Sequence, residues 1–189
     1  MTSICNRSNC LTIIRPTVIF GEQNRGNVYN LLRQIAGGHF PMVGKGTNRK
    51  SMNYVENEGK LPCFDKDFDG TEKGALHLFN YCDEPAYDMN HLVLDVYKHL
   101  GKPKKRLFHF PFWIAYLGGK CFDLAAFILH RKFAINSIRV KKFTQNTYFR
   151  SARVPETGFK APVELEEGLR RTIDYEFVRK TEGHVFHCE

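Results

Sequence analysis

Leu11-Thr-Ile-Ile-Arg-Pro-Thr-Val-Ile-Phe-Gly21 is the stretch that decides the fold. Its continuous run of β-branched and apolar residues is typical of a strand buried on both faces, as in a parallel sheet. Because proline has no N–H to donate, Pro16 must lie at the end of the strand or at a bulge. Apolar residues at helical spacing over 28–36, closed by Gly37-Gly38, predict a helix directly afterwards. A buried strand followed by a helix indicates an α/β fold.

Strands and helices alternate along the rest of the chain. The same patterns predict further strands and helices, in chain order, at 40–43, 51–55, 75–81, 89–100, 112–129 and 165–177. Asp88 is the expected N-cap of the helix over 89–100. The segment 58–74 carries glycine, proline and many acids without a period, so we expect an exposed loop. The fold class is α/β, with too few strands for a complete doubly wound sheet.

Charge is unevenly distributed in this chain of 189 residues with a net charge of +8. The segments 98–106 and 131–153 carry five and seven Lys and Arg residues, respectively, and no acid. We interpret the first as a solvated face. Apolar residues interleave the second, which favours an ordered structure that presents cations suited to phosphate.

The terminal segments and cysteines indicate an intracellular setting. We expect disorder over 1–10 and a flexible tail over 178–189. The first residues are polar and lack the apolar core of a secretory signal, and the six scattered cysteines match no common zinc pattern. We therefore expect free thiols, no metal site and a cytoplasmic location. The apolar segment 107–129 is interrupted by glycines and charges, so it predicts buried amphipathic helices rather than a membrane span.

Three patches, in order, resemble the extended short-chain dehydrogenases, the NAD-dependent epimerase/dehydratase family. Ile14-Arg-Pro-Thr-Val-Ile-Phe-Gly21 is similar to its Arg-Pro-x-x-Val-Tyr-Gly strand end. Val43-Gly-Lys-Gly46, with Arg49 and Val55-Glu-Asn57 after it, is similar to a Gly-x-Gly turn, an arginine and a Val-x-Asp. Ser151-Ala-Arg153, Gly158-Phe-Lys-Ala-Pro162 and Leu165-Glu-Glu-Gly-Leu169 are similar to its closing pattern.

The resemblance implies a C-terminal portion only, over 11–177, of a protein like the UDP-glucose 4-epimerases. Its fold would be an incomplete Rossmann-type unit, with late sheet strands and the small C-terminal α/β substrate-binding lobe. It also implies a nucleotide-sugar ligand (UDP-sugar-like) and NAD. The implied substrate-binding residues are Arg49, Thr17, Asn27, Val43, Gly44 and Arg139, and the implied cofactor-binding residues are Pro16 and Val18.

Simpler interpretations stay open for three of these residues. Arg49 matches the family arginine that contacts the substrate phosphates, but a surface arginine beside a glycine turn would look the same. Arg139 could equally be structural. Asn27 opens a helix, where anions bind well, yet an ordinary N-cap would explain it too.

The family's catalytic parts are missing from the sequence. A Gly-x-x-Gly-x-x-Gly turn for NAD and a Tyr-x-x-x-Lys pair should precede Leu11, and only ten residues do so. Tyr116 and Lys120 have the right spacing but lie downstream of the Arg-Pro strand, so we interpret them as a coincidence. We therefore expect no catalytic residue and no activity from this chain alone. It would be a truncated product, or one piece of a split enzyme whose partner chain supplies the N-terminal half.

Two other functions are compatible with the sequence. The cationic segment could bind RNA or another anion in a non-catalytic module, although the resemblance predicts no nucleic-acid partner. The segment 107–129 could make peripheral membrane contact, as in the sterol dehydrogenases that share this fold.

Overall fold

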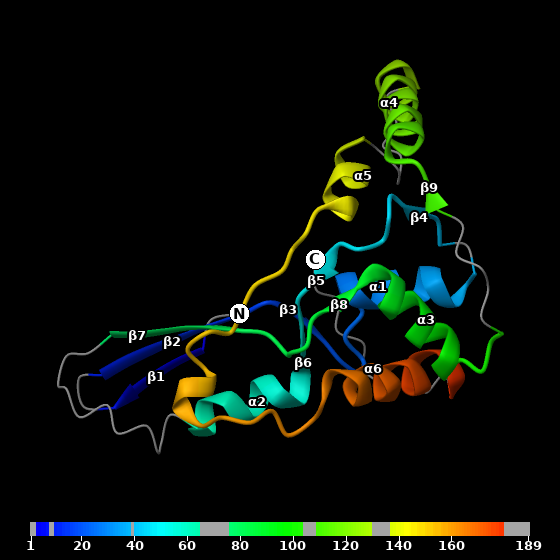
Figure 1. Ribbon diagram of the computed structural model, residues 1–189. Coiled ribbons are helices and arrows are strands. Elements are labelled where there is room, and N and C mark those ends of the chain that lie inside the picture. Colours follow the sequence, from blue (N-terminus) through cyan, green and yellow to red (C-terminus); the bar gives the residue numbers. More distant parts are fainter. Residues whose placement is uncertain are drawn as a thin grey trace.

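A three-stranded sheet forms one end of the protein. The computed structural model describes residues 3–7, 10–38, 40–64, 76–103, 109–129 and 137–179. Strand β2 (Cys10–Pro16) lies between β1 (Ser3–Arg7), which is antiparallel to it, and β7 (Leu76–Tyr81), which is parallel (Figure 1). The parallel pairing with β7 confirms that part of the prediction, and Pro16 ends the strand as expected. Burial on both faces is not observed, because Ile14 is buried but Ile13 is half-buried and Arg15 is exposed. The structure differs from the expected disorder over 1–10, because residues 3–7 find an open edge of β2 to pair with.

The chain changes its strand partner at Thr17. The short strand β3 (Val18–Phe20) pairs in parallel with β6 (Met52–Tyr54), with Val18 opposite Met52. The Thr17 N–H still donates to the Tyr81 carbonyl at 3.0 Å, so the turn stays attached to β7. The single predicted strand is therefore two, which diverge after Pro16.

Three helices form the main core together with residues of β3 and β6. They are α1 (Asn27–Ala36), α3 (Met89–His99) and α6 (Leu165–Ile173), each close to its predicted range. Leu165, Leu169 and Ile173 are almost fully buried, as their four-residue spacing predicts. The Asp88 carboxylate accepts the His91 N–H at 2.7 Å, which confirms the predicted N-cap. After α6 the chain continues as a π-helical turn, η2 (Asp174–Val178).

Shorter strand pairs connect this core to the rest of the chain. Strand β4 (Met42–Val43) is parallel to β9 (His109–Phe110), and β5 (Arg49–Lys50) is antiparallel to β8 (Tyr87–Asp88). A short 3₁₀ turn, η1 (Pro155–Thr157), precedes α6.

Helix α2 (Val55–Phe64) replaces the first part of the loop predicted over 58–74. Its residues Gly59 and Pro62 are poor helix formers, which made the loop prediction reasonable. Tertiary contacts override this preference, because Asn57 is fully buried and Leu61 packs with Ile14 and Phe79 in a second core. Residues 65–75 of the predicted loop, and 180–189 of the predicted tail, lie outside the described residues.

The predicted burial of the 107–129 segment is wrong for most of its described side chains. Helix α4 (Phe112–Leu129) is one continuous helix, and it stands with α5 (Ser137–Thr144) away from the sheet (Figure 1). Trp113 is 67% exposed and Leu117 is 59% exposed. Apolar composition is typical of a core helix, but here α4 exposes these apolar side chains at the surface. Within the part of the chain that the structure describes, no helix has the length and apolar character to cross a membrane.

Candidate functional site

The end of β2 is the candidate ligand-binding edge. α/β proteins bind ligands outside the carboxyl ends of their strands, and β2 ends at Pro16, where its pairing with β7 gives way to the pairing of β3 with β6. The Thr17 hydroxyl oxygen is buried and has no hydrogen-bond partner among the residues that the structure describes. Pro16 is half-buried and Val18 is 44% exposed. A buried hydroxyl without a partner is costly, so this position fits a polar ligand.

Arg49 lies on the segment that leads into this edge. It is in β5, three residues before Met52, the partner of Val18. At about 3.3 Å per residue in a strand, its Cα lies roughly 10 Å from that of Met52. Its side chain is exposed, and the guanidinium carbon lies 5.9 Å from the centre of the Tyr148 ring. The contact holds a planar cation at the surface, in the form that suits a phosphate group.

A strap formed by residues 145–151 runs beside β5 and β6. The Thr147 N–H donates to the Arg49 carbonyl, and the Ser51 N–H donates to the Thr147 carbonyl, both at 3.1 Å. The Lys50 ammonium donates to the Gln145 carbonyl at 2.9 Å, and burial lowers the pKa of Lys50. The strap thus fixes Tyr148 beside Arg49.

Sequence reasoning missed this strap as a part of the site. The cations of the 131–153 segment indicate a phosphate contact, but the aromatic pair within the same segment was not identified. Tyr148 is 41% exposed and Phe149 is 57% exposed. An aromatic pair between cationic residues was the signal available. Aromatic rings beside a guanidinium suit a ligand that has both apolar and anionic parts.

A buried polar clasp lies beneath the candidate site. The Asp83 carboxylate accepts the Tyr54 N–H at 2.7 Å, the Tyr81 hydroxyl at 2.7 Å and the Asn57 amide at 3.0 Å. Burial raises the pKa of Asp83, and burial beside this carboxylate raises the pKa of Tyr81. The Asn57 amide also donates to the Val163 carbonyl at 2.8 Å and accepts the Val163 N–H at 3.1 Å. The clasp joins β6, β7, α2 and the loop before α6.

The clasp explains why an asparagine stands where the family pattern has aspartate. Two of its bonds need Asn57 to donate, one to a carboxylate and one to a carbonyl, and an ionised aspartate could make neither. Asn57 in place of the family's aspartate is therefore accounted for by Asp83, whose carboxylate accepts a hydrogen bond from the Asn57 amide.

The other implied site residues lie in three different places. Asn27 is exposed at the first position of α1, but Gly26 is the N-cap and makes no side-chain bond, so the N-cap interpretation of Asn27 is wrong. Val43 is buried in β4, and the Gly44 N–H donates to the Phe110 carbonyl at 2.9 Å. That donor is already engaged. Arg139 belongs to α5, and its side chain lies outside the described part of the structure.

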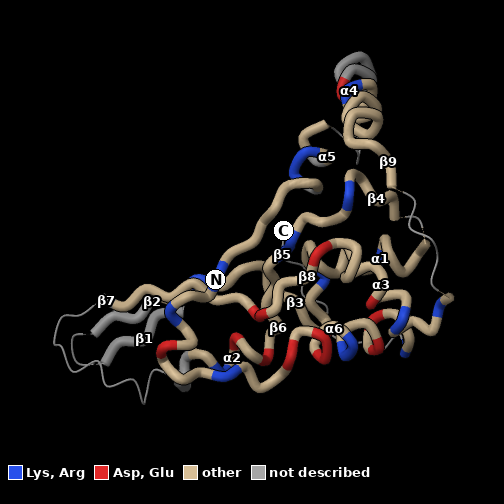
Figure 2. Tube along the Cα trace, viewed as in Figure 1, with Lys and Arg blue, Asp and Glu red and all other residues tan. Residues whose placement is uncertain are grey.

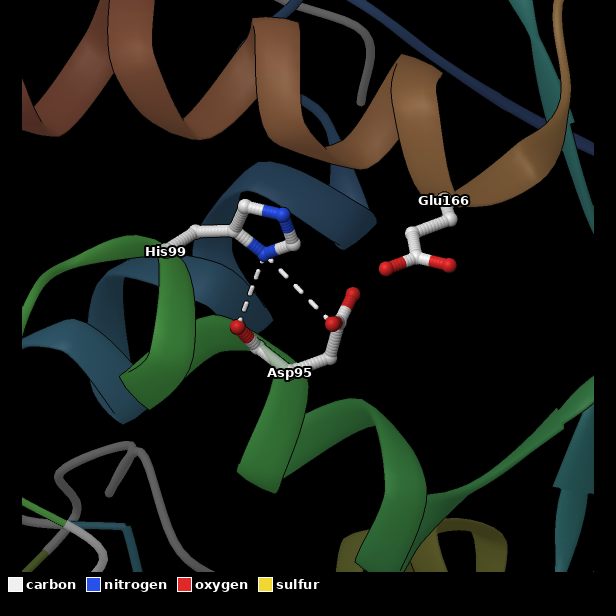
Figure 3. A group of neighbouring side chains, drawn as sticks. All are labelled: Asp95, His99 and Glu166. Atoms are coloured by element: carbon white, nitrogen blue, oxygen red, sulfur yellow. Dashed lines mark hydrogen bonds and ion pairs between the residues drawn. The ribbon is translucent and has the colours of Figure 1, made fainter.

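A second polar cluster joins α3 to α6. Figure 3 shows Asp95, His99 and Glu166, whose possible metal-ligand atoms all lie within 4.8 Å of one another. His99 Nδ1 lies 2.9 Å from the Asp95 carbonyl oxygen and 3.5 Å from its carboxylate, and the Lys98 ammonium lies 3.0 Å from Glu166. Glu166 is already paired with Lys98, and His99 is already in contact with Asp95. We therefore interpret this cluster as a structural contact between α3 and α6.

This cluster predicts a pH-dependent effect of Asp95→Asn. Burial raises the pKa of Asp95; Glu166 adds to the rise, while His99, Lys98 and His91 oppose it. A raised carboxyl pKa means that ionisation destabilises the folded state, a cost present above the folded pKa and absent below the unfolded one. Asn should therefore gain stability relative to Asp as the pH rises from about 4 to about 7.5. Urea denaturation at both pH values measures this gain, and Glu156→Gln, an exposed neutralisation, should show no such trend.

Comparison with solved structures identifies the fold. The chain aligns with UDP-glucose 4-epimerase of Thermotoga maritima in complex with UDP-glucose, at 18% identity and a TM-score of 0.53, covering 89% of this chain and 46% of that one. It also aligns with WbmG of Bordetella bronchiseptica in complex with NAD and UDP, at 9% identity and a TM-score of 0.55, covering 93% and 47%. The fold is therefore part of a Rossmann-type α/β unit, as predicted, and covers about half of each of these structures. No family model matches the chain.

Comparison with curated proteins finds a relative of higher sequence identity. The chain is 51% identical over 175 residues to an N-acetyl-α-D-glucosaminyl-diphospho-ditrans,octacis-undecaprenol 4-epimerase of Escherichia coli O157:H7. The match covers 93% of this chain and 52% of that protein. A second relative, the uncharacterised protein y4nL of Sinorhizobium fredii, is 25% identical over 177 residues. The epimerase relative confirms the resemblance to the C-terminal portion of the NAD-dependent epimerase/dehydratase family that the three sequence patches predicted. It spans about half the length of the curated relatives it matches.

Proposed function

We propose that this chain is the substrate-binding part of an NAD-dependent 4-epimerase that acts on an N-acetylhexosamine linked through a diphosphate to a polyprenol. The identity of 51% across 93% of the chain to the Escherichia coli O157:H7 epimerase carries this proposal, because that enzyme is named for such a substrate. A nucleotide-sugar and a polyprenyl-diphosphate sugar share the sugar diphosphate. The proposed ligand therefore has the same diphosphate as the nucleotide-sugar that the resemblance implies, but it carries a polyprenyl lipid in place of the nucleoside.

Arg49 would contact the diphosphate. It is exposed, it is held beside the strap, and its planar guanidinium can donate two parallel hydrogen bonds to phosphate oxygens. Tyr148 and Phe149 would lie along the apolar part of the ligand, which begins directly after the diphosphate in a polyprenyl substrate.

Thr17 would contact the sugar or the cofactor at the strand end. Its buried hydroxyl lacks a partner and can donate to or accept from a ligand hydroxyl. Pro16 and Val18 flank it and would form an apolar wall for the nicotinamide of NAD, a fit that the exposed side of Val18 supports. NAD supplies the reversible hydride transfer of such epimerases, and residues outside this chain would provide the catalytic tyrosine and lysine.

Arg49→Gln tests the proposal by binding. The ligands are N-acetylglucosaminyl-diphospho-farnesol, as a short soluble analogue, and UDP-N-acetylglucosamine, each titrated calorimetrically into the chain. We expect the farnesyl ligand to bind more tightly. Arg49→Gln should weaken its binding roughly tenfold or more, since a charge-assisted hydrogen bond contributes about 1.5–3 kcal/mol.

Arg33→Gln is the matched control for charge. Arg33 is an exposed arginine on α1, and its removal should leave the affinity unchanged. Tighter binding of the UDP ligand would favour the nucleotide-sugar instead. Equal affinities of the Arg49→Gln variant and the unaltered chain would contradict the assignment of Arg49.

A further inference from the structure

An arm made of β9, α4 and α5 (109–129 and 137–144) exposes an unusual amount of apolar surface. Seven of the twelve large apolar side chains that are exposed in the described residues lie on this arm. They are Phe110, Phe112, Trp113, Ile114, Leu117, Phe122 and Ile138. Single exposed apolar residues are normal, but a concentration of this kind marks a contact surface.

The charges of the described arm are complementary to an anionic surface. Lys120, Lys141 and Lys142 are exposed, whereas Asp123 is the only acid in the arm. The Asp123 carboxylate is engaged, because it accepts the Ser137 hydroxyl at 2.5 Å. Figure 2 shows Lys and Arg on α5, while acidic residues gather around α2 and α6 at the other end of the protein. An apolar surface flanked by lysines is the pattern of a helix that lies in the boundary between lipid head groups and acyl chains.

The position of the arm connects this surface to the candidate site. Figure 1 shows α4 projecting from the body, on the side away from the β1-β2-β7 sheet. Helix α5 ends at Thr144, and the strap that holds Arg49 begins with the next residue. The ammonium of Lys50 also donates to the Lys142 carbonyl at 3.4 Å. The arm and the proposed diphosphate contact are therefore joined by a short, hydrogen-bonded segment.

We propose that the arm docks on an anionic phospholipid bilayer, with Trp113 and Leu117 inserted at the acyl boundary and Lys141 and Lys142 against lipid phosphates. The inference rests on the proposed function in one respect: a polyprenyl-diphosphate substrate lies in the membrane, so its diphosphate reaches Arg49 only if the protein approaches the surface. Trp113, the most exposed of these apolar residues, is of the type enriched at membrane interfaces.

Trp113 is also the reporter for the test, because the chain has one tryptophan. The purified chain is mixed with vesicles of phosphatidylethanolamine and phosphatidylglycerol, or of phosphatidylcholine alone, none of which contains a polyprenyl lipid. We expect the Trp113 emission to shift to the blue with the anionic vesicles and to be quenched by brominated acyl chains. Little change is expected with phosphatidylcholine.

Variants separate insertion from charge. Leu117→Glu keeps the reporter and should weaken partitioning onto anionic vesicles roughly tenfold, the loss expected for one leucine-sized contact with the acyl region. Lys141→Glu combined with Lys142→Glu should weaken it by at least a similar factor at low salt, and the difference should shrink at high salt. Val178→Glu, at an exposed apolar position outside the arm, should leave binding unchanged. Circular dichroism checks that each variant is folded.

Three outcomes would overturn the proposal: no emission shift with the unaltered chain, equal losses in Leu117→Glu and Val178→Glu, or an arm-dependent dimer in sedimentation without vesicle binding. The last would assign the surface to a second copy of the chain. Because the vesicles hold no substrate, bilayer binding can succeed while the ligand titration of Arg49→Gln fails, and the reverse. The two proposals are thus tested separately.

Discussion

Asn57→Asp is expected to destabilise the fold by about 3 kcal/mol at neutral pH, the range for a buried charge left without compensation. The new carboxylate would stand where the amide now donates to Asp83 at 3.0 Å and to the Val163 carbonyl at 2.8 Å. Both contacts would become repulsive, and Asn57 is fully buried, so water cannot replace them.

The loss should depend on pH in a defined direction. Burial already raises the pKa of Asp83, and a second carboxylate beside it would raise the pKa of the pair further. A raised folded-state pKa makes the cost largest above that pKa and lets it shrink as the pH falls through it. Urea denaturation should therefore show a large deficit at about pH 7 and a smaller one at about pH 4.5. Asn30→Asp makes the same chemical change at an exposed position of α1 and should stay within about 0.5 kcal/mol of the unaltered chain at both pH values. Equal stability of Asn57→Asp and Asn30→Asp at neutral pH would show that the clasp does not constrain position 57.

Regular elements were predictable where one local signal dominated. The run from Leu11 predicted a strand in parallel pairing, the stripe of Leu165, Leu169 and Ile173 predicted α6, and Asp88 predicted the start of α3. In each case local preference and packing favour the same structure. The family resemblance succeeded for a similar reason, because it used the order of three patches rather than one motif.

Predictions failed where tertiary contacts oppose local preference. Gly59 and Pro62 favour a loop, yet burial of Asn57 and Leu61 keeps α2 helical. The apolar composition of α4 predicts burial, but composition cannot reveal whether a helix packs on its own chain or on another surface. Pairing of residues 3–7 with β2 depends on an open sheet edge, which no local pattern encodes.

The candidate site was predictable only in part. Thr17 and Arg49 were identified from the resemblance, and in the structure they lie shortly before the amino-terminal ends of the paired parallel strands β3 and β6, respectively. The strap of residues 145–151 was not identified, because it lies nearly a hundred residues from Arg49 in the sequence. It contacts Arg49 through a backbone hydrogen bond from Thr147, through the Asn146 side chain and through the Tyr148 ring. Contacts of that separation leave no periodicity in the sequence.

Gly168→Ala is the second substitution expected to have a large effect, with a net loss of about 2 kcal/mol. A Cβ at this position would lie 2.7 Å from Cγ and 2.9 Å from Cδ2 of the Tyr54 ring. The ring cannot move aside, because the Tyr54 N–H is bound to Asp83 and its hydroxyl to Glu22 at 3.0 Å. Overpacking of a core costs about 1–3 kcal/mol, and we place this contact at the upper end, offset by about 1 kcal/mol of helix propensity gained by alanine.

Gly59→Ala separates the two contributions, because it places the same methyl group in α2 with no atom within 4 Å. It should stabilise the chain by about 0.5–1 kcal/mol through helix propensity alone. Chemical denaturation of both variants measures the change in the free energy of unfolding, which should be negative for Gly168→Ala and positive for Gly59→Ala. Tyr54→Ala should remove the clash. Gly168→Ala should therefore destabilise the Tyr54→Ala variant less than it destabilises the unaltered chain. If Gly168→Ala stabilised the chain as Gly59→Ala does, α6 could not pack on Tyr54 as closely as described. The glycine of the Leu165–Leu169 pattern would then serve some purpose other than close approach of the helix to the β6 strand.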